Sequence, residues 1–307
     1  MTSHAQVKII WAYAFLLPLL LYFTVFTIYP IVMSYVYSTF DWNGLGPLEN
    51  FVFLNNYKQV LADDAFWNAF TNNLIFIFFK TIILVPLALV TAIILNLAYL
   101  KGKTFFRTVY FLPVVTTASV IGVVMKFIFG NDNALVNNIL IWAGVIHKAI
   151  PWLAQANTAF IVLIGISIWK SFGMIMVYWL AGLQSLPEDT FEAAKIDGAN
   201  AWQTFWYITL PMLAPVGTVI VLLTVVNSMH VFDLAKTLTD GGPFFATDMM
   251  DLYIYRYAFG NAGFPQMGYA SAAGIVFGLA VFLITLVLSG IVRAAKAEPN
   301  GRKKGVV

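Results

Sequence analysis

The stretch "EAAKIDGANAWQTFWYITLPMLAP", residues 192–215, separates two long apolar runs in the second half of the chain. Just before it, Ser185-Leu186-Pro187-Glu188 fits a helix start, with a serine cap, a proline in the first turn and a glutamate that closes a capping box. Gly198 can end this helix, because glycine adopts the left-handed cap conformation without strain. The sequence therefore predicts a short helix up to Asp197, about 12 residues and roughly 18 Å long.

The composition of this short helix favours a protein partner over a lipid surface. Its charged residues are Glu188, Asp189, Glu192 and Asp197 against the single base Lys195. A helix that lies on anionic lipid carries Lys and Arg on its polar face, which this one does not. Ala193 and Ala194 leave its middle thin, so that another protein's backbone can approach. We therefore expect the segment 184–210 to dock a partner.

The composition of the whole chain indicates an integral membrane protein. Of its 307 residues, 61% are hydrophobic and 10% are charged, against about 45–50% and about 25% in soluble domains. The chain has no cysteine, which excludes disulfides and thiolate chemistry, and its three histidines are too scattered for a metal site. A net charge of +3 does not favour nucleic acid as a partner. We expect lipid to be the solvent of most of the surface.

The apolar runs predict an all-α, polytopic bundle with six transmembrane helices, because a spanning helix needs roughly 20 apolar residues. No internal repeat, separate domain or signal peptide is evident, so residues 1–307 are expected to form one transmembrane domain. Six spans place both termini on the same side of the membrane. The predicted spans are about 10–37, 70–98, 108–129, 158–183, 211–232 and 270–293.

The basic residues predict that both termini and the segment 184–210 are cytoplasmic. In that orientation the inside segments hold Lys8, Lys101, Lys103, Arg107, Lys195, Arg293, Lys296, Arg302, Lys303 and Lys304. The outside segments hold four bases, Lys58, Lys148, Lys236 and Arg256, and most of the acids, Asp41, Glu49, Asp63, Asp64, Asp132, Asp233, Asp240, Asp248 and Asp251. This bias follows the rule that Lys and Arg concentrate in cytoplasmic loops.

Three further lysines fall inside the predicted spans or near their ends. Lys126 is close to a helix end and is expected to extend to the interface. Lys80 and Lys170 lie deeper. Because a charge near mid-membrane costs several kcal/mol in lipid, these two should face a protein interface or a wet cavity. A role in a solute path and a role in packing both stay open.

Several motifs carry a family resemblance. Glu192-Ala193-Ala194, Asp197-Gly198-Ala199 and Leu210-Pro211 resemble the EAA loop of permease subunits of binding-protein-dependent ABC importers. Phe106-Arg107 with Phe111-Leu112-Pro113, and Leu238-Thr239-Asp240-Gly241-Gly242-Pro243, are similar to the carbohydrate branch of that family, the maltose and glycerol-3-phosphate type. The resemblance covers nearly the whole chain and is strongest to the subunit type with the Gly-Gly-Pro loop.

The resemblance implies a permease of the type I importer fold in the bacterial inner membrane. Its implied partners are a second, different permease, two cytoplasmic ATPases and an extracytoplasmic solute-binding protein. The residues implied in coupling to the ATPase are Glu192, Ala193, Ala194, Asp197, Gly198, Leu210 and Pro211. The chain has no Walker A motif: in "ISIWKS", residues 166–171, Trp169 stands where the second glycine is needed. ATP and Mg are therefore expected on the partner subunits, and this chain is expected to bind no cofactor or metal and to catalyse no reaction.

Polar residues on two predicted spans are candidates for the solute path, because sugars are held by polar side chains. They are Ser167, Lys170, Ser171, Thr224, Asn227, Ser228 and His230. Asn227 and His230 are three residues apart, which places them on one face of a helix. Helix packing is the competing interpretation for the serines. Ser228 and Val231 stand where maltose-type relatives have asparagines, so the same sugar is not implied.

Two other functional classes compete with the importer permease. A stand-alone secondary transporter of a small polar solute should carry coupling carboxylates within its spans, but all fourteen acids fall in predicted linkers or tails. A membrane enzyme should show a nucleophile with its base or paired acids within a span, and none is evident. The outside loop 233–269, with Tyr253, Tyr255 and Tyr257 at alternate positions, fits either a brace for the bundle or a docking surface for the binding protein.

Overall fold

The structure is a computed structural model that describes residues 2–97, 99–130, 134–260 and 264–297. This part of the chain is nearly all helix and contains no named strand, only one isolated antiparallel bridge between Phe40 and Phe51. The prediction of an all-α fold is confirmed. Asp132, Arg302, Lys303 and Lys304, which entered the charge count, lie outside the described residues.

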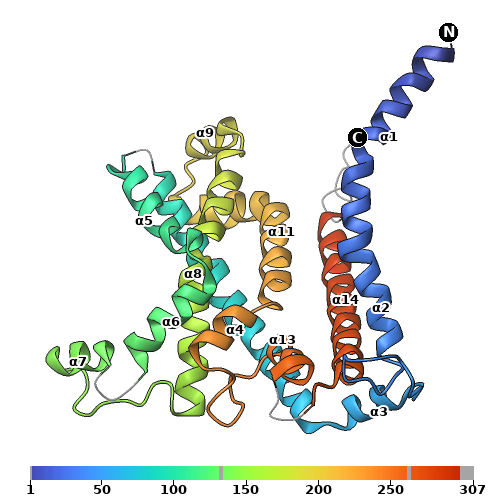
Figure 1. The fold of residues 1–307 in the computed structure, drawn as a ribbon. Coiled ribbons are helices and arrows are strands. Elements are labelled where there is room, and N and C mark those ends of the chain that lie inside the picture. Colours follow the sequence, from blue (N-terminus) through green and yellow to red (C-terminus); the bar gives the residue numbers. More distant parts are fainter. Residues whose placement is uncertain (1, 98, 131–133, 261–263, 298–307) are drawn as a thin grey trace. The chain divides into compact units, whose positions relative to one another are not determined.

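Among the described residues, five helical segments are long and apolar enough to cross a membrane: Tyr13–Tyr37, Asp64–Asn96, Ala156–Gln184, Ala201–Ser228 and Met267–Gly290 (Figure 1). The first comprises most of α1 (Thr2–Phe23), η1 (Thr24–Ile28) and α2 (Tyr29–Tyr37). The next two are α4 (Asp64–Asn96) and α8 (Ala156–Gln184). The fourth joins α10 (Ala201–Thr204), η2 (Phe205–Thr209) and α11 (Leu210–Ser228), and the fifth belongs to α14 (Met267–Ala297).

The predicted third span, 108–129, is not one straight helix. The structure has α5 (Lys103–Val115) and α6 (Ala118–Phe129), which meet at 98°. The bend lies at Thr116 and Thr117, whose backbones are both extended. Two consecutive β-branched residues favour that conformation and interrupt the helix. A single helix over 108–129 is therefore wrong.

Two π-helical turns explain how prolines fit near the middle of long apolar segments. In η1 the N–H of Tyr29 donates to Thr24, and in η2 the N–H of Leu210 donates to Phe205. Each turn precedes a proline at the start of the next helix, Pro30 of α2 and Pro211 of α11. The i→i+5 hydrogen bonds of each π-helical turn already widen the helix at this point. The helix therefore stays continuous although the proline has no N–H to donate.

The described residues form two compact units, one from those within 1–66 and 253–279 and one from those within 67–252 and 280–297. The core of the second unit lies between α4, α8 and α11, with Leu84, Met176 and Leu213 fully buried. There Trp179 donates its indole N–H to the carbonyl of Val85 at 3.0 Å. The remaining helices are α3 (Asn55–Ala62), α7 (Leu135–Trp142), α9 (Glu188–Ile196), α12 (Phe232–Leu238), α13 (Met250–Tyr255) and η3 (Arg256–Gly260).

The first unit is held by three tyrosines around one carboxylate. Tyr253, Tyr257 and Tyr269 donate their hydroxyls to Oδ2 of Asp63 at 2.5, 3.3 and 2.9 Å. Burial alone would raise the pKa of Asp63, but the hydrogen bonds from Tyr253, from the backbone of Ala65 and from the other tyrosines hold the pKa below its ordinary value. Tyr253 and Tyr257 of the outside loop thus brace the fold, whereas Tyr255 stacks on Phe259.

Candidate functional site

The helix predicted within 184–210 exists, but it begins later than expected. It is α9, Glu188–Ile196, which makes it nine residues long instead of about 12. Ser185 does not cap it: its N–H donates to the carbonyl of Ala181 and its hydroxyl to Gly182, so it ends α8. The prediction of a Ser185 capping box is wrong, because the N–H and the hydroxyl of Ser185 donate to the last carbonyls of α8. Glu188 and Asp189 do lie in the first turn, as the helix dipole favours.

The end of α9 has the predicted geometry. Gly198 has a φ of +78°. Its N–H donates to the carbonyl of Lys195, and the N–H of Ala199 donates to that of Ala194. These two bonds are those of a Schellman motif, in which the left-handed residue is C′. Gly198 therefore turns the chain sharply away from α9 and toward α10, which begins at a second cap, Asn200 with Gln203.

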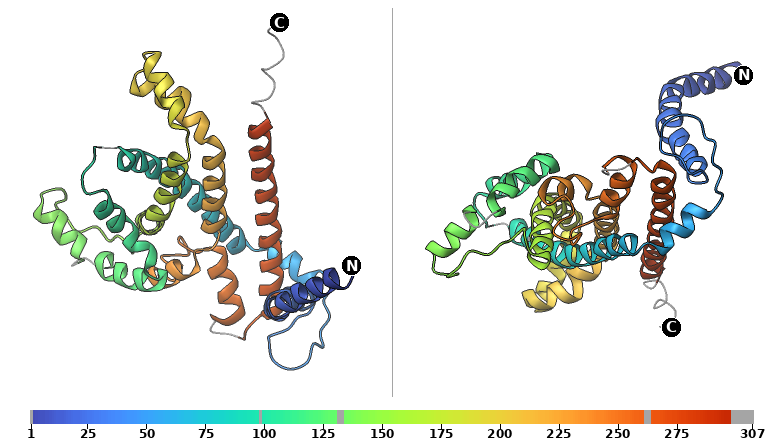
Figure 2. Two further views of the ribbon diagram at one scale, coloured as in Figure 1. Left: turned by 90° about the horizontal axis from the view of Figure 1, so that it is seen from above. Right: turned by 60° about the horizontal axis from the view of Figure 1, so that its bottom comes forward.

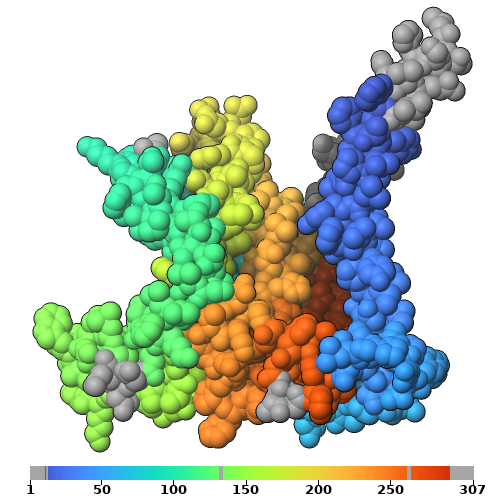
Figure 3. Space-filling model, viewed as in Figure 1, coloured from blue at the N-terminus to red at the C-terminus, as the bar shows by residue number. Residues whose placement is uncertain are grey.

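The surface of α9 is mostly acidic and apolar. Glu192, Ala193 and Asp197 are exposed, and Ile196 is 86% exposed. Ala194 is only 5% exposed, so just one of the two adjacent alanines lies on the outer face. The expectation that both leave the helix thin toward a partner is wrong for Ala194, which packs inward. Within its unit α9 protrudes at one end (Figures 2 and 3).

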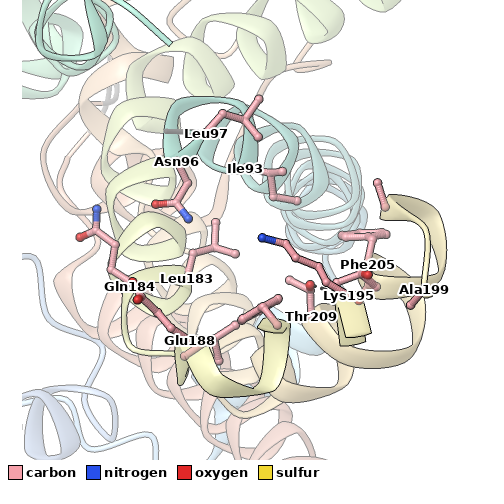
Figure 4. Close-up of a pocket in the computed structure, with 14 residues that line it drawn as sticks. Ile93, Asn96, Leu97, Leu183, Gln184, Glu188, Lys195, Ala199, Phe205 and Thr209 are labelled. Atoms are coloured by element: carbon pink, nitrogen blue, oxygen red, sulfur yellow. Dashed lines mark hydrogen bonds between the residues drawn. The ribbon is translucent and has the colours of Figure 1, made fainter. Parts of the chain in front are cut away.

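A pocket of about 660 Å³ lies behind α9 (Figure 4). Its wall includes the last turns of α4 and α8, with Asn96 and Gln184, and the start of the α10–η2 segment. Lys195 points its ammonium group into this hollow. Leu210, by contrast, packs against the hydrophobic core, with Pro211 next to it in the first turn of α11. Leu210 therefore anchors the chain that leaves α9, whereas Pro211 is exposed, and neither residue is part of α9.

A second cavity, of about 300 Å³, gathers polar residues from five helices, α4, α8, α11, α12 and α13, and from the segment after α11. Three of the predicted path residues, Ser167, Lys170 and Ser171, line it from one face of α8, at the spacing of one helical turn. Asn227 and His230 line it from the end of α11 and the residues that follow. The other lining residues are Lys80, Ala118, Val231, Phe232, Asp233, Leu234 and Asp251.

Two predicted path residues do not reach this cavity. Thr224 and Ser228 are buried, and their hydroxyls donate to the carbonyls of Ile220 and Thr224 within α11. A helical Ser or Thr commonly bonds to its own backbone in this way. The structure therefore assigns both residues to packing, and their prediction as solute contacts is not supported by their geometry.

Asn227 and His230 come together, but not by the predicted route. α11 ends at Ser228, so His230 lies beyond the helix and the i, i+3 argument is wrong. His230 is positioned instead by Asp251 of α13, whose Oδ2 lies 3.3 Å from its Nδ1. Asn73 of α4 fixes both neighbours: its amide donates to the carbonyl of Met229 and its Oδ1 accepts from the N–H of Met250.

Beside the predicted Lys170, three charged residues that were not predicted path residues also line the cavity, namely Lys80, Asp233 and Asp251. Lys80 and Lys170 are the middle residues of α4 and α8. Asp233 and Asp251 belong to the predicted outside loop, yet α12 and α13 bring them into the cavity that the middle of α4 and of α8 also lines. Only Lys80, an unpaired charge deep in an apolar run, gave a signal in the sequence. No pattern in the sequence pointed to Asp233 and Asp251, because contacts between distant segments of the chain set their position.

The amino-acid sequence of the chain is similar to those of known transport proteins. Residues 60–297 match the family model described as "Binding-protein-dependent transport system inner membrane component". A probable ABC transporter permease protein of Bacillus subtilis is 35% identical over 285 residues, which cover 92% of this chain and 94% of the relative. The permease protein of a multiple sugar-binding transport system of Streptococcus mutans is 32% identical, over 93% and 96% of the two chains.

A solved structure shares the fold. It is a bacterial ABC transporter involved in the import of the acidic polysaccharide alginate, with a TM-score of 0.82 and 24% identity over 96% of this chain and 99% of that chain. At this identity the likeness shows the fold alone. The family match and the relatives cover almost the whole chain, and so this protein belongs to the family of inner membrane components of binding-protein-dependent transport systems, as a permease.

Proposed function

We propose that this chain is one of two different permease subunits of an ATP-driven importer of carbohydrates, with both termini in the cytoplasm. The relatives named for sugars support the solute class: besides the Streptococcus mutans protein, a lactose transport permease of Rhizobium radiobacter is 33% identical over 88% of this chain. The polar cavity supports it as well, since Ser167, Ser171 and Asn227 supply hydroxyl and amide groups for sugar hydroxyls.

In this proposal α9 is the element that receives the motion of a cytoplasmic ATPase. The observation that carries it is the exposed, capped helix itself: a Schellman motif fixes its end, and its acidic surface with Ile196 is not used within the described residues of its unit. The pocket behind it separates α9 from the tips of α4 and α8. A force on α9 would reach those helices through η2 and the partly buried Leu210. ATP and Mg would be bound by the ATPases.

The test is retention of the ATPase by the purified complex. Glu192→Lys reverses a charge on the outer face of α9, so the variant should lose the ATPase subunits and ATP-driven uptake while it still inserts into the membrane. Glu49→Lys is the matched control, because Glu49 is exposed in a segment expected on the other side of the membrane. Full ATPase retention and uptake in Glu192→Lys, or equal loss in both variants, would refute the assignment of α9.

A further inference from the structure

The cavity of about 300 Å³ contains two lysines that form no ion pair with any residue the structure describes. Lys80 is 6% exposed. Neither its ammonium group nor that of Lys170 lies within 4 Å of a carboxylate among the residues that the structure describes. The nearest compensation for Lys80 is the ring of Phe76, whose centroid is 5.6 Å from Nζ. Such a contact contributes about 0.5–2 kcal/mol, whereas a lysine at the centre of a membrane helix costs about 3 kcal/mol.

The acids of the same cavity do not neutralise these lysines. Asp251 is engaged with His230 at 3.3 Å. Asp233 is exposed and lies in the first turn of α12, where the helix dipole stabilises its charge. The charges are therefore segregated: α4 and α8 present the two ammonium groups, while α12 and α13 present the carboxylates. The wall formed by α4 and α8 is therefore positively charged and suited to bind a negative group.

We infer that the solute carried through this cavity is an anionic saccharide or polyol, whose carboxylate or phosphate group binds between Lys80 and Lys170. This rests on the proposed function, in which the cavity is part of the solute path. Ser167 and Ser171 flank Lys170 on the same face of α8 and are placed to bind the adjacent hydroxyls. Each ammonium group has three rotatable donors and no fixed fork, so the lysines bind an oxyanion as point charges and suit a solute that must also leave.

Transport by the reconstituted complex tests this inference. Proteoliposomes that contain this chain, its partner permease, the ATPases and the binding protein are given a mixture of digalacturonate, neutral galactobiose, glycerol 3-phosphate and glycerol, and the accumulated compounds are identified by mass spectrometry. Digalacturonate or glycerol 3-phosphate should accumulate, which also tells carboxylate from phosphate. Lys80→Met and Lys170→Met should each lower that uptake about tenfold or more, as expected for the loss of a charge-assisted hydrogen bond.

The matched control is Lys126→Met, because Lys126 is exposed in the last turn of α6 and does not line the cavity. Lys170→Arg, which keeps the charge, should retain more uptake than Lys170→Met. Accumulation of galactobiose that is unchanged in Lys80→Met and Lys170→Met would overturn the inference, with the lysines then neutralised by an acid of the partner permease. The proposed function would survive that result.

A second measurement decides the question without transport. The purified wild-type complex should melt at a higher temperature in galacturonate than in galactose, and this difference should vanish in the two methionine variants but not in Lys126→Met. The absence of any difference between galacturonate and galactose in the wild type would overturn the inference. Failure of the proposed function looks different: no solute of either charge would accumulate, and no ATPase would be retained.

Discussion

Substitution of Gly198 should weaken the end of α9 by an amount that backbone conformation alone determines. A β-carbon at Gly198 would meet nothing within 4 Å, so no steric clash contributes. What remains is the φ of +78°, which costs roughly 1–2 kcal/mol in a residue other than glycine. That range corresponds to about a 5- to 30-fold increase in the opening of the last turn, because 1.4 kcal/mol is about a factor of ten.

The order of the substitutions tests this reasoning. Asparagine tolerates the left-handed region better than alanine, and a β-branched residue tolerates it least. Gly198→Asn should therefore be the mildest change, Gly198→Ala intermediate and Gly198→Val the most severe, although the β-carbon common to all three has open space. Ala199, whose N–H closes the Schellman motif at Ala194, should lose protection first.

The assay is amide hydrogen exchange of the reconstituted complex, measured on the peptide that covers α9, together with the solute imported per ATP hydrolysed. Gly278→Ala is the control, since Gly278 lies within α14, has no positive φ and has equally open surroundings. Exchange in α9 should rise in the predicted order and coupling should fall in the same order. Equal effects of asparagine and alanine, or an order that follows side-chain volume alone, would refute the role of the left-handed cap.

Three further predictions follow from the orientation, the cavity and the tyrosine cluster. In this cysteine-free chain, Ala193→Cys should react with a membrane-impermeant thiol reagent only from the cytoplasmic side and Glu49→Cys only from the opposite side; the reverse pattern would overturn the topology. Asn73→Leu should destabilise the complex by about 1–3 kcal/mol for each buried backbone group left unpaired, which thermal unfolding would reveal, while unchanged stability would contradict its bridging role. Asp63→Asn should lower thermal stability at neutral pH, and this loss should shrink as the pH falls below about 3.9. The folded pKa is depressed, so the stabilisation is fully present above the ordinary value of about 3.9 and is lost as the pH falls through the folded pKa. A loss of stability that does not shrink with falling pH would count against the cluster.

The sequence predicted those parts of the fold that depend on local chemistry. Apolar runs located the long helices, and the left-handed cap at Gly198 followed from residue type alone. Cap residues proved ambiguous, because Ser-x-x-Glu at 185–188 and Asn-x-x-Gln at 200–203 both fit a capping box. Only the second is one in the structure. At the first, α8 continues to Gln184 and uses Ser185 to close its own end.

The candidate cavity was predictable only in part. Ser167, Lys170 and Ser171 fall on one helix face, which periodicity reveals, and they meet as expected. Asp233 and Asp251 could not be placed, because α12 and α13 fold back through contacts between distant segments such as that of Asn73 with Met250. Thr224 and Ser228 were predicted as path residues because they are polar. In the structure their hydroxyls donate to backbone carbonyls within α11.

The contact between α9 and an ATPase can be measured directly by photo-cross-linking. The photoreactive residue p-benzoylphenylalanine replaces Ile196, which is 86% exposed on α9, in the intact complex in native membranes, and replaces the exposed Glu49 as the control. Irradiation should attach the ATPase subunit to this chain from position 196 and not from position 49. Adducts from position 196 that contain only lipid or the partner permease would contradict the account of α9 as the element that couples ATP hydrolysis to transport.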